Sequence, residues 1–342
     1  MVFKRFQGSM FHPTHFTPKS NTHHPTRHHR SPARPSSKAQ ATAWRSLTCV
    51  LSALSLLTAC GGADNTVPNI DLIRSEERFP PLEKAFAEPR DDTIEVFILA
   101  GQSNMVGRAR ESGLEDDKIV PQTGAIIHVQ GQVEADLAGQ WRPLTAGFGR
   151  RADFFGPELT FGLTQEALRP GPRVAIIKHA VGGSDLDNNW NASGGPLYQD
   201  LQTHIAQAME ELAPLGDAHL AGVVWVQGEN DAVNLGASER YKDNLTAFVA
   251  QIRQDLDSPQ LPFVVALVAP SESWPHHPLV RQAQRDVASA DPNVVTVESE
   301  DLPVLSGDPL HYNARGLQTL GERTAEAMAP LLPTFVPKDN RP

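Results

Sequence analysis

Short apolar runs alternate with helical patterns from residue 93 to about residue 330, and this alternation restricts the fold more than any other feature. A short apolar run that ends at a glycine or a polar cluster is typical of a strand buried in a parallel sheet. Five such runs occur: Ile94–Ala100, Arg173–Ala180, Ala221–Val226, Pro262–Ala269 and Asn293–Val297. Helical patterns lie between them, at about 157–168, 197–213, 238–256, 278–290 and 314–330. We therefore expect an α/β fold, a three-layer α/β/α sandwich with a roughly five-stranded parallel sheet.

The stretch 105–155 is less regular than the rest. It contains one candidate strand, Ala125–Val129. We expect this stretch to form a long excursion at the carboxyl edge of the sheet, where open α/β sheets bind their ligands.

Charge divides the chain into two unequal parts. Residues 1–59 carry eight basic side chains and no acidic one, which leaves 22 basic and 40 acidic side chains, or a charge of -18, for residues 60–342. An acidic body argues against binding to nucleic acid, which requires clustered Lys and Arg. The chain has only two cysteines, which excludes a disulfide scaffold and a multi-thiolate zinc site.

The amino-terminal segment has the features of an export signal. The apolar run Leu47–Leu57 follows Arg45 and is too short for a membrane-spanning helix, which needs about 20 apolar residues. The sequence Leu57-Thr58-Ala59-Cys60 resembles the bacterial lipobox, which implies cleavage before Cys60 and its lipidation. Gly61 follows the cysteine, which favours the outer membrane. We expect an exported lipoprotein, periplasmic or at the cell surface, attached to the membrane only through Cys60.

Four segments follow from this interpretation. Residues 1–59 form the cleaved signal, 60–92 a Pro- and Gly-containing linker with at most a short helix near 81–88, 93–332 the main folded domain and 333–342 a tail.

Residues able to do chemistry follow the predicted strands. Ser103 lies on a glycine-led turn after the first strand, where it is either a nucleophile or a helix cap. Gly182 and Gly183 follow the second strand, and their backbone N–H groups can stabilise an oxyanion unless the pair is an ordinary tight turn. Gln227 and Asn230 follow the third strand, and their amides can do the same, although Asn230 is equally suited to cap a helix.

The last polar cluster is Asp308-Pro309-Leu310-His311, after the fifth strand. Among the seven histidines of the body, only His311 has a carboxylate three residues earlier in a loop. Asp308 can accept from the imidazole Nδ1–H, which leaves Nε2 free to take a proton from Ser103.

Together these blocks resemble the SGNH (GDSL-like) hydrolase superfamily, and within it the sialate O-acetylesterase and acetylxylan esterase group, carbohydrate esterase family six. The similarity runs from about Ile94 to Ala327. The matching blocks are Phe97–Met105 (FILAGQSNM), Phe155–Glu158 (FGPE), Ala180–Gly183 (AVGG), Trp225–Glu229 (WVQGE) and Asp308–Asn313 (DPLHYN). The resemblance implies a flavodoxin-like SGNH hydrolase fold and a Ser-His-Asp serine esterase that needs no metal or cofactor.

The resemblance assigns roles to individual residues. Ser103 is the implied nucleophile, His311 the base and Asp308 the group that orients it, while Glu229 stays open as an alternative orienter. The oxyanion hole would combine the Ser103 N–H, an N–H of Gly182 or Gly183, and a side-chain amide. Asn230 stands where the group usually has Ser, so that amide is Gln227, Asn230 or both.

The implied substrate is an acetylated carbohydrate, such as acetylated xylan or sialic acid. Trp190 and Trp274 are candidate sugar platforms, whereas Trp225 lies within an apolar strand and suits the core. Arg108 can contact substrate or pair with an acidic side chain. Two alternatives stay open: a hydrolase of another ester (a lipase, thioesterase or peptidoglycan O-acetylesterase), and a noncatalytic glycan-binding lipoprotein. The sequence leaves the oligomeric state undetermined.

Overall fold

The computed structural model describes residues 79, 82, 85, 92–122 and 124–336. The predicted signal segment, Cys60 and most of the predicted linker with its short helix lie outside the described residues. Among the helices of the described part, none is long and apolar enough to cross a membrane.

The centre of the fold is a seven-stranded sheet in the order β4-β3-β6-β1-β7-β8-β9. Its strands are β1 (Thr93–Gly101), β3 (Ala125–Gly131), β4 (Trp141–Pro143), β6 (Arg173–Ala180), β7 (Asp217–Val226), β8 (Phe263–Ala266) and β9 (Val294–Val297). All neighbours pair in parallel except β4, which is antiparallel to β3. The five predicted strands are confirmed. The sheet is wider than predicted because the excursion 105–155 supplies β3, which pairs with β6, and β4, which pairs with β3.

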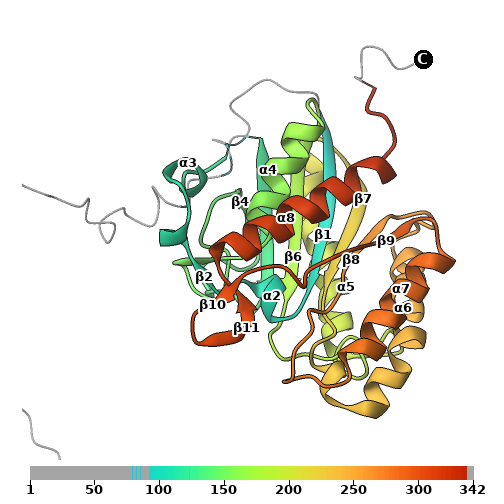
Figure 1. The fold of residues 1–342 in the computed structure, drawn as a ribbon. Helices are drawn as coiled ribbons and strands as arrows, with labels where there is room; N and C mark the ends of the chain where they lie inside the picture. The colour runs from blue at the N-terminus through green and yellow to red at the C-terminus, as the bar shows by residue number, and fades with distance from the viewer. Residues whose placement is uncertain (1–78, 80–81, 83–84, 86–91, 123, 337–342) are drawn as a thin grey trace, which may run out of the picture. The chain divides into compact units, whose positions relative to one another are not determined.

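Helices cover both faces of this sheet, as the apolar runs require (Figure 1). The five main helices are α4 (Glu158–Leu168), α5 (Pro196–Leu212), α6 (Leu235–Asp255), α7 (His277–Ala290) and α8 (Ala314–Met328). Side chains alternate along β1: Val96 and Ile98 pack in one apolar cluster with α5, α6 and α7, whereas Phe97 and Leu99 pack in another with α4 and α8. The predicted three-layer α/β/α fold is therefore confirmed.

Short elements lie at the carboxyl edge of the sheet. They are α2 (Ser103–Val106), β2 (Ala109–Arg110), β5 (Phe154–Phe155), β10 (Val304–Leu305) and β11 (Asp308–Tyr312). Helix α3 (Asp116–Ile119) lies instead toward the amino end of β3, the strand that follows it, so the excursion is only partly at the predicted carboxyl edge (Figure 1). Strand β2 pairs with β5, and β10 pairs with β11, so each pair is a small sheet separate from the main one.

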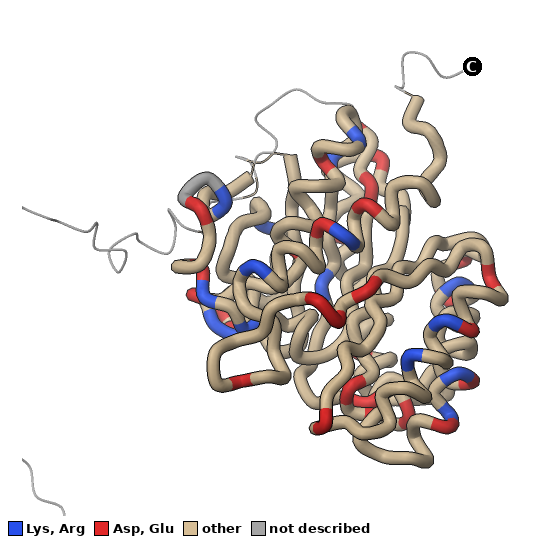
Figure 2. The backbone as a smooth tube through the Cα atoms, viewed as in Figure 1, with Lys and Arg blue, Asp and Glu red and all other residues tan. Residues whose placement is uncertain are grey.

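Basic and acidic residues alternate on the outer helices. Figure 2 shows both signs side by side along α6 and α7. Lys242 of α6 contacts Asp286 of α7 at 3.2 Å, and both side chains are exposed. Exposed pairs of this kind contribute about 1 kcal/mol or less, so they do not define the fold.

Candidate active site

Three neighbouring strands end in one row. The register pairs Gly101 at the end of β1 with Ala180 of β6 on one side and Val226 of β7 on the other. Gly101 has a φ of 150°, and a Cβ there would lie 2.1 Å from the Val226 carbonyl oxygen, so a side chain cannot be accommodated. The turn after β1 therefore begins in close contact with β7.

Ser103 is the first residue of α2, directly after this turn. Its neighbour Asn104 is buried and connects three segments. The Asn104 side-chain amide donates to Glu229 Oε1 at 3.1 Å and to the Leu310 carbonyl at 3.3 Å, and its oxygen accepts from the Tyr312 N–H at 3.1 Å. Asn104 thus fixes β11, which carries His311, relative to the serine turn.

His311 and Asp308 are in direct contact. His311 Nδ1 lies 2.7 Å from Asp308 Oδ2, and the Leu310 N–H donates to Asp308 Oδ1 at 3.1 Å. Burial tends to raise the pKa of Asp308, but the hydrogen bonds from His311 and Leu310 and the charge of Arg108 bring that pKa below its ordinary value. An ionised carboxylate only accepts hydrogen bonds, so Nδ1 carries the proton and Nε2 is left as an acceptor.

Glu229, the alternative orienter, has a different partner. Its Oε1 accepts from Asn104, and its Oε2 is buried with no hydrogen-bond partner among the described residues. Burial raises the pKa of Glu229, and the hydrogen bond from Asn104 opposes this shift. The contact seen at His311 is with Asp308, and this favours Asp308 as the orienter.

Ser103 and His311 open into the same cleft, which has a volume of about 380 Å³. Its walls also include Gln102, Arg108, Gly182, Gly183, Glu229, Asn230, Val233, Ser273, Trp274 and Leu310. The polar residues after β1, β6 and β7 thus converge with His311 of β11, as expected for the carboxyl edge of a parallel sheet.

Backbone donors are available beside Ser103. The Ser103 N–H begins a helix and has no partner within it. The Gly182 N–H donates to Gln132 Oε1 at 3.0 Å, so a ligand oxygen must displace the Gln132 side chain to reach this donor. Gly183 has a φ of 72°, which favours glycine, and a Cβ there would meet no atom within 4 Å.

The two candidate amides differ in what they contact. The Gln227 amide nitrogen donates to Asp231 Oδ2 at 2.6 Å and to the Ser184 carbonyl at 3.1 Å, and its oxygen accepts from Tyr241 at 3.1 Å. Gln227 is buried and does not line the cleft, and its amide hydrogens are bonded to Asp231 and Ser184. They are therefore not available to an oxyanion. Asn230 does line the cleft, which favours Asn230 as the side-chain donor.

Burial corrects one of the proposed sugar contacts. Trp190 is fully buried, donates to Ser184 Oγ at 2.7 Å and stacks edge-on against Trp225, so it belongs to the core rather than to a sugar platform. Trp225 is also fully buried, as expected. Trp274 lines the cleft, with its indole nitrogen donating to the Ala269 carbonyl at 2.6 Å. It therefore remains a candidate.

Arg108 lines the cleft but makes no ion pair with a carboxylate in the described part of the chain. Burial and the nearby charge of Arg150 lower the pKa of Arg108, and Asp308 opposes them. The pairing with an acidic side chain, one of the two roles predicted for Arg108, is thus not found among the described residues, and a substrate contact is the interpretation that fits.

Two polar residues of the site were missed from the sequence. Lys178 is fully buried and donates to the Val106 carbonyl at the end of α2 at 3.0 Å and to Glu158 at 2.6 Å. A lysine inside an apolar strand was the available signal for it. Gln132 follows β3 and donates its N–H to the Ala180 carbonyl at 2.8 Å, and no local pattern points to it.

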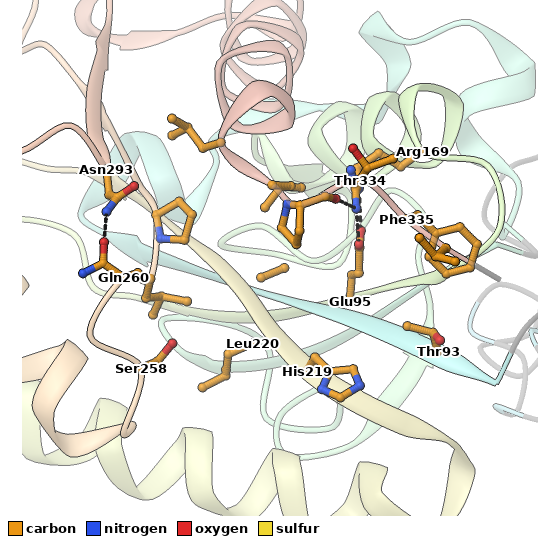
Figure 3. A pocket seen from close by; sticks show the side chains of 17 residues that line it. Thr93, Glu95, Arg169, His219, Leu220, Ser258, Gln260, Asn293, Thr334 and Phe335 are labelled. Atoms are coloured by element: carbon orange, nitrogen blue, oxygen red, sulfur yellow. Dashed lines mark hydrogen bonds and ion pairs between the residues drawn. The ribbon is translucent and has the colours of Figure 1, made fainter. Parts of the chain in front are cut away.

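A larger cavity, about 710 Å³, lies elsewhere, near the amino ends of β1, β8 and β9 (Figure 3). Arg169 there donates to both oxygens of Glu95, at 2.5 and 2.9 Å, and to the Pro333 carbonyl at 2.9 Å. These groups already satisfy one another, and none of the predicted catalytic residues lines this cavity. In the described residues, no group of three or more His, Cys, Asp or Glu is arranged to hold a metal ion.

Comparison with known proteins agrees with this geometry. The chain is 26% identical over 244 residues to a probable carbohydrate esterase of Arabidopsis thaliana. The aligned region covers 68% of this chain and 89% of the relative. A solved Arabidopsis thaliana structure has a TM-score of 0.57 at 23% identity and covers 70% of this chain and 98% of its own. The structure of a carbohydrate acetylesterase from Xanthomonas citri has a TM-score of 0.52 at 18% identity, and the match covers 70% of this chain and 56% of that chain. The structure of NanS has a TM-score of 0.55 at 17% identity, and the match covers 71% of this chain and 98% of that chain.

These structures share the fold. The decisive match is that of the family described as "Carbohydrate esterase, sialic acid-specific acetylesterase", whose model covers residues 93–330. That range holds the whole sheet and every residue of the cleft. The chain belongs to this family of carbohydrate esterases and is a carboxylic ester hydrolase.

Proposed function

We propose that this protein removes O-acetyl groups from carbohydrate, such as acetylated xylan, sialic acid or a similar glycan, through a Ser-His-Asp acyl-enzyme mechanism. The observation that carries the proposal is the 2.7 Å contact of Asp308 with His311, in a cleft that also contains Ser103. The membership in a family of sialic acid-specific acetylesterases supports the acetyl ester as the bond that is broken.

Ser103 Oγ attacks the acetyl carbonyl carbon while His311 Nε2 takes the hydroxyl proton. Asp308 stabilises the resulting imidazolium and keeps it oriented. The tetrahedral intermediate then collapses, and His311 returns the proton to the departing sugar oxygen. Water attacks the acetyl-serine in the same way and releases acetate.

The negative charge of the intermediate lies on the former carbonyl oxygen. The Ser103 N–H, the N–H of Gly182 or Gly183, and the Asn230 amide are the donors that we assign to this oxygen. Each preorganised donor contributes about 3 kcal/mol, or roughly 10²–10³ in rate.

Hydrolysis of p-nitrophenyl acetate by wild-type and Ser103→Ala protein tests the mechanism. We expect the Ser103→Ala variant to lose about 10⁴-fold or more in kcat, since the nucleophile cannot be replaced. Equal rates for the two proteins would refute the enzyme mechanism and favour a noncatalytic glycan-binding protein.

Acetate release from acetylated xylan, acetylated sialoglycan and acetylated peptidoglycan tests the substrate class. We expect release from at least one of the carbohydrates, together with a preference for acetyl over long acyl p-nitrophenyl esters. Faster turnover of long acyl esters would favour a lipase or thioesterase instead.

A further inference from the structure

Two buried oxygen atoms of residues that line the catalytic cleft lack a hydrogen-bond donor in the described chain. They are Gln102 Oε1 and Glu229 Oε2. Gln102 is 4% exposed and Glu229 7% exposed. A buried acceptor without a donor destabilises the folded protein, and more so when the acceptor is charged. Native proteins keep few such atoms, so each one requires an explanation.

Glu229 is held close to the nucleophile. Its Oε1 accepts from Asn104, which directly follows Ser103 and also anchors β11. The carboxyl group therefore cannot rotate freely to find another donor without breaking a contact of the catalytic framework. Its second oxygen is thus a buried acceptor near the serine that has no hydrogen-bond partner in the described part of the chain.

The rest of the cleft indicates the kind of donor. Arg108 lines the same cleft without an ion pair to a described carboxylate, so a cationic ligand would meet a like charge. A neutral hydroxyl group meets no such penalty. Trp274 adds an apolar wall, because its indole nitrogen is already bonded to Ala269. A polyol with hydroxyl groups next to the ester matches these surroundings.

We propose that Glu229, assisted by Gln102, is a specificity-determining residue that accepts a hydrogen bond from a free hydroxyl group on the carbon next to the ester-bearing carbon. The preferred substrate is then the monoacetate of a vicinal diol, and a sugar acetylated at the neighbouring position as well is a poor substrate. This inference rests on the proposed esterase function.

The test compares two small esters of the same size, 2-hydroxyethyl acetate and propyl acetate, which differ only by a hydroxyl in place of a methyl group. The kcat/KM of each is divided by its rate of alkaline hydrolysis to remove differences in intrinsic reactivity. We expect wild type to prefer the hydroxylated ester about tenfold, since a buried acceptor left without its donor costs about that factor.

Glu229→Gln is the informative variant. It keeps an oxygen to accept from Asn104 and replaces the second oxygen with a donor. We expect it to lower the preference ratio about tenfold. Ser273→Ala, which removes a hydroxyl from the same cleft, is the matched control and should keep the wild-type ratio.

The outcomes separate the two hypotheses. If wild type and Ser103→Ala are equally inert on both esters, the proposed esterase function fails. If wild type is active but shows a ratio near one, or if Glu229→Gln keeps the wild-type ratio, the hydroxyl inference is overturned while the esterase function stands. Because the wild-type ratio is decisive by itself, the test does not depend on the folding of the variant.

Discussion

At the scale of single residues, hydrogen bonds decide which side chains remain available for chemistry. Gln227 and Asn230 lie three positions apart after the same strand, and the sequence alone gives either one as an oxyanion donor. Gln227 is fully used by Asp231, Ser184 and Tyr241, whereas Asn230 faces the cleft. The same criterion removes Trp190 from the substrate contacts.

Substitution of these two amides should therefore affect different properties. We expect Asn230→Ala to lower kcat on p-nitrophenyl acetate by about 10²–10³ with little change in melting temperature, because it removes one oxyanion donor. Gln227→Ala should lower the melting temperature, because it leaves buried partners unsatisfied. Steady-state kinetics and thermal unfolding of both variants measure this. A fully active Asn230→Ala enzyme would show that Asn230 is not a donor.

At the scale of elements, buried polar side chains connect the nucleophile helix to the sheet. Lys178 of β6 contacts Glu158 of α4 and the carbonyl groups of Val106 and Phe148. Burial lowers the pKa of Lys178, and the charge of Glu158 opposes this. The pair thus connects β6 and α4, and through the Val106 carbonyl it also connects them to α2, the helix that begins at Ser103.

Breaking this pair should destabilise the fold. We expect Lys178→Met to lower the free energy of unfolding by about 3–5 kcal/mol, because it leaves the Glu158 charge buried and unpaired. The double variant Lys178→Met/Glu158→Gln should recover part of the loss, since the amide can still accept from Gly156. Urea unfolding at pH 7 measures both changes. A loss below about 1 kcal/mol in the single variant would contradict the role given to the pair.

A second buried group joins β3, β6 and α5. His204 Nε2 lies 2.7 Å from His128 Nδ1, and His204 Nδ1 lies 3.3 Å from His179 Nδ1. Burial lowers the pKa of all three histidines, to about 4 for His179 and about 2 for His204, while Glu211 opposes the shift at His128. The folded state therefore binds fewer protons than the unfolded chain in mild acid.

Stability should accordingly fall as the pH drops below about 6.5, where unfolded histidines take up protons, and for His179 the loss should continue to about pH 4. We expect His204→Gln to reduce the slope of unfolding free energy against pH by up to about 1.4 kcal/mol per unit, since one titrating group is removed. Thr203→Ala on the same helix is a non-titrating control. Denaturant unfolding between pH 4 and 7 measures the slopes, and an unchanged slope in His204→Gln would contradict the assignment.

At the scale of the whole molecule, the strongly basic first 59 residues and the acidic remainder suggest an exported enzyme with a lipid anchor. We propose that Cys60 carries this anchor. In a bacterial host, labelled palmitate should be incorporated into wild type, and Cys60→Ala should abolish the labelling and leave the enzyme out of the membrane fraction. Equal labelling of both proteins would exclude Cys60 as the attachment site.

Much of the fold was predictable because its signals are local. The five predicted strands and the five main helices follow from the spacing of apolar residues, and three of these strands end one or two residues before Ser103, Gly182 and Gln227. Strand β3 and the edge strand β4 were harder to predict. Only Ala125–Val129 carries an apolar pattern there, and β4 is three residues long.

The sequence by itself determined the fold class, the order of the polar clusters and the Asp308–His311 contact, because periodicity, glycine turns and a three-residue spacing are short-range properties. Only the tertiary structure gave Gln227 and Asn230 their different contacts, buried Trp190, and brought Gln132 to Gly182 across 50 positions and Asn104 to Glu229 across 125. These choices depend on burial and on donors and acceptors that meet only when the strands assemble, so no local pattern encodes them.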